Sequence, residues 1–122
     1  MRRRTLFLAA SLLALPPLLA LAKSARAHHG WGSYDSERPL TLTGVVERIG
    51  FENPHGVLIL GTPEKVWEVV LAPPFRMINR GLEERQIRVG DTVEVMGYPH
   101  RTREIELRAE WIKVQGKITQ LR

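Results

Sequence analysis

Apolar and polar residues alternate along much of the segment 40–116, with the two-residue period that is typical of β-strands. The first stretch, 40–51, alternates over most of its length, and Gly44-Val45-Val46 interrupts the alternation as a β-bulge does. It predicts one long, bent strand. Shorter stretches rich in apolar and β-branched residues predict four more strands, within 56–62, 65–72, 89–98 and 104–116.

The alternation also predicts which side chains face the core of the sheet. Apolar residues two positions apart are expected on the inner face, and the intervening charged residues Glu104 and Glu106 on the outer face. The predicted inward set consists of Trp67, Val69, Leu71, Val93, Val95, Ile105, Leu107, Ala109 and Trp111.

One short helix is expected between the third and fourth strands. Its segment, 73–81, has proline where a first helical turn begins, apolar Phe75 and Ile78 three residues apart, and Gly81 where a helix ends. The fold class is therefore all-β with one short helix. Three strands, a helix and two strands, with a long bulged first strand, form the order of a five-stranded Greek-key barrel of the OB type. An open β-sandwich is the alternative fold.

The first 27 residues predict a cleaved signal peptide. Arg2-Arg3-Arg4 precede an apolar stretch at 6–22, and Ala25-Arg26-Ala27 matches the small-x-small pattern of a cleavage site. Because Pro16-Pro17 interrupts the apolar stretch, a membrane span is not expected. The chain has no cysteine, so a lipid anchor, disulfides and thiolate metal sites are not expected either.

The export route has two interpretations. Arg3-Arg4 followed by Thr5-Leu6-Phe7 resembles a twin-arginine signal, and an ordinary secretory signal with a basic start fits as well. Both predict a periplasmic or secreted protein.

Removal of the signal peptide changes the charge of the chain. Of the 18 Lys and Arg residues, five lie within the first 27 residues, whereas all 13 Asp and Glu residues lie after them. The remainder then carries 13 residues of each sign, and this balance gives no general attraction to nucleic acid. We therefore expect no nucleic-acid partner and no stable membrane insertion after cleavage.

Three segments are expected along the chain: a signal peptide at 1–27, an N-terminal arm at 28–39 and a barrel domain at 40–122. The arm is rich in Gly, Ser and polar residues and has no period, and its Trp31 and Tyr34 are candidates for packing against the barrel. The 95 residues after the signal are enough for one small domain.

All four histidines lie in the arm or in two predicted loops. His28 and His29 begin the arm, whereas His55 and His100 each follow a proline, in the loops after the first and fourth strands. In an OB barrel these two loops border the usual binding face. Proline also stiffens the turn that presents each loop histidine.

Several motifs occur together along the chain: His28-His29, Tyr34-Asp35, 39–44, 51–55, 80–82 and 89–93. In this combination the chain resembles an exported bacterial family described as domain of unknown function 6152. The paired histidines and the Asn-Pro-His turn are the most specific elements, and the resemblance covers about residues 28–98. That family usually has an aromatic residue, often Trp, two positions before the Asn, where this chain has Phe51. The resemblance implies a fold and export, and no established activity. Because it ends near residue 98, it does not support His100 as a site residue.

The histidines predict a candidate metal site. Cleavage after residue 27 gives His28 a free α-amine, so one residue offers an amine and an imidazole to the same ion. An imidazole from His55 or His29 completes a set of three nitrogen donors, which suits Cu(II) ahead of Zn(II) and Ni(II). His100 is a further candidate ligand. A polar tail and a purely conformational Asn-Pro-His turn are the alternatives to a metal site.

Two other functions remain open from the sequence. The first is an interaction module without metal for an envelope protein, a peptide or a glycan, with contact aromatics Trp31, Tyr34, Phe51 and Tyr98. The second is an oxidative copper enzyme, which needs an open coordination position beside a substrate surface that no motif indicates. We therefore expect a binding protein that is not an enzyme, and the sequence predicts no particular oligomeric state.

Overall fold

The computed structural model describes residues 30–122, so the predicted signal peptide and the pair His28-His29 lie outside the described residues. Within this part of the chain, no helix is long and apolar enough to cross a membrane. The elements are a 3-10 helix at Trp31–Ser33, β1 (Leu40–Gly50), β2 (Val57–Gly61), β3 (Val66–Val70), α1 (Pro74–Asn79), a 3-10 helix at Glu84–Gln86, β4 (Thr92–Pro99), β5 (Glu106–Val114) and β6 (Lys117–Gln120).

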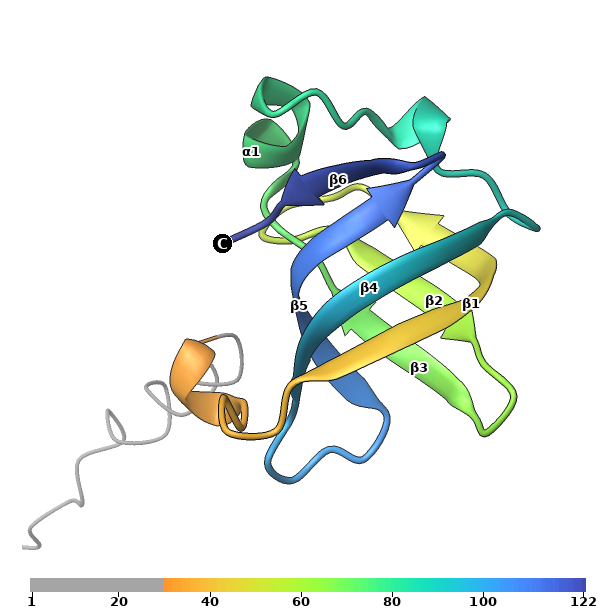
Figure 1. The fold of residues 1–122 in the computed structure, drawn as a ribbon. Helices are drawn as coiled ribbons and strands as arrows, with labels where there is room; N and C mark the ends of the chain where they lie inside the picture. Colours follow the sequence, from red (N-terminus) through yellow and green to blue (C-terminus); the bar gives the residue numbers. More distant parts are fainter. Residues whose placement is uncertain (1–29) are drawn as a thin grey trace, which may run out of the picture.

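The strands form one sheet that closes on itself (Figure 1). The first half of β1 pairs with β4 and the second half with β2, both antiparallel. β2 continues to β3, and β4 continues to β5. A parallel pairing of β3 with β5 over residues 68–70 then joins the two ends. This closed pairing of five strands, with α1 between β3 and β4, confirms the predicted OB-type barrel and excludes the open sandwich.

The long first strand bends where the sequence predicts it, but the bulge lies further along. The register shifts between Val46 and Arg48, so Glu47 is the extra residue. Gly44 meets a different requirement, because a Cβ atom there would lie 2.5 Å from the carbonyl oxygen of Gly61. Gly44 allows β1 and β2 to approach closely. The bulge at Glu47 lies further along the strand.

A second irregularity changes the inward pattern of β5. The pairing passes from Met96 with Trp111 to Gly97 with Ala109, which leaves Glu110 as an extra residue. The predicted alternation therefore holds for Leu107 and Ala109 and is wrong for Trp111, which is partly exposed. The inward positions continue instead at Ile112 and Val114. Of the other predicted inward residues, Trp67, Val69, Leu71, Val93 and Val95 are buried and Ile105 is exposed.

The end of the chain adds a strand that the sequence analysis did not assign. β6 pairs with β5 through a two-residue turn at Gln115 and Gly116, both of which have positive φ. The sheet therefore has six strands instead of five.

The helix forms where predicted and presents a different face to the core. Proline begins α1, and Gly81 follows it with φ of +86°, as expected for a residue that ends a helix. Met77 is fully buried, whereas Phe75 is 75% exposed and Ile78 is 50% exposed. The three-residue spacing of Phe75 and Ile78 thus marks the helix but not its buried face.

We expect Gly97→Ala to destabilise the barrel because its Cβ atom would lie 2.1 Å from the carbonyl oxygen of Arg108 in the paired strand. Neither backbone can move without disturbing the sheet, so the free energy of unfolding should fall by about 1–3 kcal/mol in urea denaturation. Gly32→Ala is the matched control, since among residues 30–122, its own neighbours in the chain aside, no atom lies within 4 Å of the added Cβ. Equal losses in the two variants would contradict this account.

Candidate functional site

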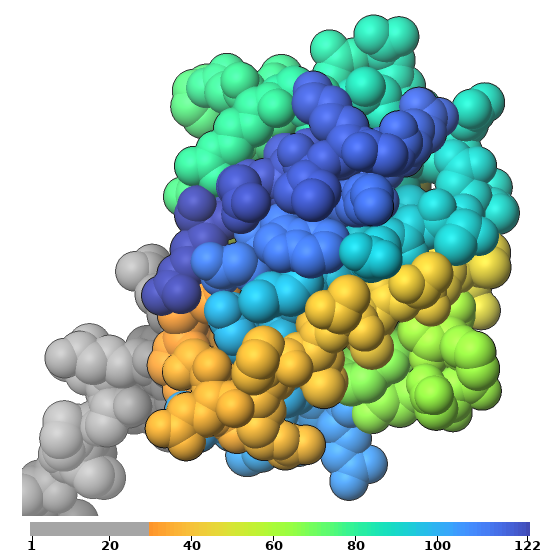
Figure 2. Space-filling model, in the orientation of Figure 1, coloured from red at the N-terminus to blue at the C-terminus, as the bar shows by residue number. Residues whose placement is uncertain are grey.

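The N-terminal arm lies against the barrel as part of its surface (Figure 2). The amide of Asp35 donates to the carbonyl oxygen of Pro99 at 2.9 Å, and the amide of Arg101 donates to that of Ser33 at 2.9 Å. These bonds attach the arm to the end of β4 and to the loop that follows. The arm therefore covers one part of the outer face of the sheet and leaves another part open.

A buried carboxylate connects the arm to β5. Glu106, predicted on the outer face, is only 1% exposed because the arm covers it. Its Oε2 accepts a hydrogen bond from the Tyr34 hydroxyl at 2.7 Å, and its Oε1 accepts one from Arg103 Nη1 at 2.6 Å. Each oxygen thus has a donor, which compensates the desolvation of the charge.

Tyr34 acts as a permanent donor in this network. Burial, together with its hydrogen bond to Glu106, raises the pKa of the Tyr34 hydroxyl well above its usual value. The hydroxyl therefore stays protonated at physiological pH and keeps donating to the carboxylate.

His100 is held within the same network. Its Nδ1 accepts the backbone N–H groups of Thr102 at 3.2 Å and Arg103 at 3.0 Å. Because Nδ1 is an acceptor, we assign the ring proton to Nε2, which lies 3.7 Å from Oε2 of Glu106. In this arrangement His100 orders the loop after β4, and neither nitrogen directs a lone pair outward.

Arg108 links His55 to the arm. Its guanidinium lies 4.5 Å from the ring centroid of Trp31, and its Nη2 lies 3.3 Å from Nε2 of His55. Burial lowers the pKa of Arg108, which is 5% exposed, but an arginine remains charged in a protein. Arg122 stacks on Trp31 as well, at 4.4 Å. The guanidinium of Arg108 also lies 5.9 Å from the ring centroid of Tyr34, which is 5.2 Å from that of His100. His55 and His100 therefore belong to one face of the barrel.

The four aromatic residues predicted to contact a partner do not form one surface. Tyr34 is buried, so its ring serves the fold and is closed to a partner. Trp31 and Tyr98 are partly exposed and lie edge to face at 6.2 Å. Phe51 packs against the core and borders a separate groove beside α1.

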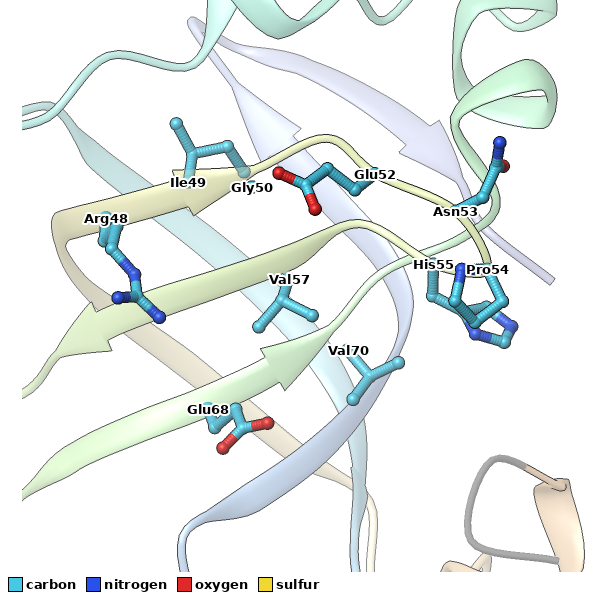
Figure 3. Close-up of a pocket in the computed structure, with 10 residues that line it drawn as sticks. All are labelled: Arg48, Ile49, Gly50, Glu52, Asn53, Pro54, His55, Val57, Glu68 and Val70. Carbon is cyan, nitrogen blue, oxygen red and sulfur yellow. The ribbon is translucent and has the colours of Figure 1, made fainter. Parts of the chain in front are cut away.

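A groove of about 580 Å³ opens on the outer face of β1, β2 and β3, beside the loop that carries His55. Figure 3 shows the loop residues Asn53, Pro54 and His55 at one end of this groove, and Arg48 and Glu68 on its strands. The lining residues are Arg48, Ile49, Gly50, Glu52, Asn53, Pro54, His55, Val57, Glu68 and Val70. OB domains commonly bind ligands on this face, so we name it the β2–β3 groove.

Within residues 30–122, no three or more His, Asp or Glu side chains are arranged to hold a metal ion. His55 and His100 alone do not form a ligand set, and the predicted ligands His28 and His29 lie outside the described residues. The copper site therefore stays a prediction.

Sequence reasoning missed Glu106 and Arg108, which organise this face. They alternate with apolar residues in β5, as charges on a solvated face do. The signal that could have identified them is the aromatic pair in the arm, because a buried Tyr34 hydroxyl needs a hydrogen-bond partner and the face of the Trp31 ring attracts a cation.

We expect Tyr34→Phe to lower the free energy of unfolding by about 1–3 kcal/mol, because Glu106 would lose a donor while remaining buried. Tyr98→Phe is the matched control, since its hydroxyl makes no hydrogen bond to residues 30–122. Chemical denaturation at neutral pH measures both. A loss in Tyr98→Phe as large as that in Tyr34→Phe would show that the hydrogen bond is not the cause.

Comparison with known proteins supports the fold and identifies the family. No curated protein matches the chain. Among solved structures, the complex of TiaS with a tRNA and ATP is similar at 21% identity and a TM-score of 0.50, over 73% of this chain and 20% of that chain. The S. pombe Stn1–Ten1 complex is similar at 24% identity and a TM-score of 0.48, over 70% of this chain and 59% of that chain. The chain therefore spans only part of either relative.

The match to a family is more extensive. The family of unknown function DUF6152 matches residues 14–107, which is most of the chain, and the protein belongs to this family.

Proposed function

We propose that this protein is an exported binding module, without catalytic activity, that holds an extended peptide segment of an envelope protein in the β2–β3 groove. The observation that carries the proposal is the groove itself, open on the face of the barrel that the arm leaves uncovered. The predicted signal peptide supports a periplasmic or extracellular location. The groove has the combination of apolar floor and charged walls that an extended peptide meets with alternating side chains.

The lining of the groove favours a peptide over other ligands. Val57, which is partly exposed, provides apolar surface, and Arg48 and Glu68 provide one charge of each sign. Nucleic acid fits poorly, because the described lining has two acids for one arginine and no aromatic platform for bases. The groove likewise offers no aromatic side chain on which a sugar ring could stack.

We expect Val57→Glu to weaken peptide binding at least about tenfold, because it places an unpaired charge on the apolar floor. Peptides selected from a random displayed library on the wild-type protein supply the ligand, and fluorescence polarisation measures the affinity. Val45→Glu is the matched control, an exposed strand valine outside the groove lining. Selected peptides that bind both variants equally, or a library that yields no binder, would overturn the proposal.

A second candidate function is binding of copper by the mature N-terminus and His55. One observation favours it: Trp31, three residues after His28, stacks on the guanidinium that contacts His55. The start of the described chain therefore lies on the same face as His55. Copper would have to replace the contact between His55 and Arg108, which places this candidate second.

We expect Cu(II) to bind one-to-one to protein whose N-terminus is confirmed by mass as His28, and His28→Ala or His55→Ala to abolish tight binding in calorimetry. One extra residue ahead of His28 should also abolish it, because the α-amine would be blocked. His100→Ala should retain binding, since Nδ1 of His100 is occupied by backbone donors. Weak binding that is the same with and without the extra residue would exclude copper.

A further inference from the structure

A pocket of about 360 Å³ lies where the start of β1, the β2–β3 connection and the loop after β4 meet. We name it the basic pocket. Its lining residues are Arg38, Leu40, Lys65, Trp67, Pro99, His100, Arg101, Thr102 and Glu104. None of them lines the β2–β3 groove, so the two sites are separate.

The charge of this pocket is unbalanced. Arg38, Lys65 and Arg101 line it against a single acid, Glu104, although the chain after residue 27 has equal numbers of each sign. None of the three cations forms an ion pair within residues 30–122. Residues 1–29 cannot neutralise them, because that segment contains no Asp or Glu.

Two of the cations are held in position by the fold and keep free donors. Lys65 Nζ donates to the carbonyl oxygen of Glu104 at 2.6 Å and lies 3.9 Å from the ring centroid of Trp67. Arg101 Nε donates to the carbonyl oxygen of Gly32 at 3.1 Å. An ammonium has three donors and a guanidinium five, so most of their N–H groups remain available to a ligand.

The side chain of Trp67 also lines the basic pocket. Trp67 is 7% exposed, and its indole Nε1 has no hydrogen-bond partner among residues 30–122. Buried indole N–H groups usually have one. Because Nε1 itself is covered from solvent, an ion in the pocket would contact the three cations, and the indole N–H of Trp67 serves as a reporter beside them.

We propose that the basic pocket binds a tetrahedral oxyanion, either free phosphate or sulfate or the phosphate of a lipid headgroup. The three cations supply charge-assisted hydrogen bonds, which suit an oxyanion with several acceptor oxygens. This site goes beyond the peptide function proposed above. It does not depend on that function, because the basic pocket and the β2–β3 groove share no lining residue.

The test is a titration of the natural mature protein with inorganic phosphate at constant ionic strength, followed by the assigned indole ¹H–¹⁵N signal of Trp67. We expect a saturable shift, at millimolar or lower concentration, that chloride does not produce. Arg38→Ala should weaken binding about tenfold, the loss of one charge-assisted contact. The side chain of Arg38 makes no hydrogen bond to residues 30–122, so this variant leaves the fold intact.

Arg88→Ala is the matched control, because it removes the same charge from an exposed arginine outside the pocket. A shift that stays linear to about 50 mM phosphate, far above a millimolar affinity, would overturn the proposal for a free ion. Vesicles of zwitterionic lipid with and without anionic phospholipid form the second arm. Binding that needs the anionic lipid and Arg38, but not Arg88, assigns the site to a headgroup; no dependence on Arg38 in either arm overturns the proposal entirely.

Discussion

Glu106 lies on the outer face of β5 with its carboxylate removed from water, so the protein itself must supply donors to both oxygens. One donor comes from the arm, through Tyr34, and the other from the loop after β4, through Arg103. This requirement fixes both segments against the barrel. It also explains why the arm, which has no regular pattern in the sequence, has a defined course in the structure.

The position of the arm determines which surfaces of the barrel remain open. By covering Glu106 and stacking Trp31 on Arg108, the arm occupies the outer face of β5. β3, which pairs with β5, and β2 beyond it stay uncovered and form the groove. The far side of the arm borders the basic pocket through Arg38. Two surfaces of different chemistry thus result from one segment of chain. The groove carries both signs of charge, and the basic pocket carries an excess of one.

Much of the barrel could be predicted from the sequence, because strand periodicity and the glycine and proline positions are local signals. The five strands, the helix at 74–79 and the turn glycine Gly81 follow from such signals. The site could be predicted less well, since it depends on contacts between distant segments. The bulge at Glu110 reverses the alternation within β5, and the burial of Glu106 requires a contact with Tyr34, which lies 72 residues earlier. Neither leaves a local pattern.

The same guanidinium that neutralises Glu106 also reaches the β2–β3 groove. Arg103 Nη1 donates to Glu106, and its Nη2 lies 3.5 Å from Oε2 of Glu68, which lines the groove. The backbone of Arg103 in turn donates to His100, a residue of the basic pocket. One loop residue therefore sets the position of a groove wall, of the buried carboxylate and of a pocket histidine. Since both oxygens of Glu106 are already occupied, a ligand that draws Glu68 away from Arg103 changes only the outer end of this network, and the arm stays attached through Tyr34.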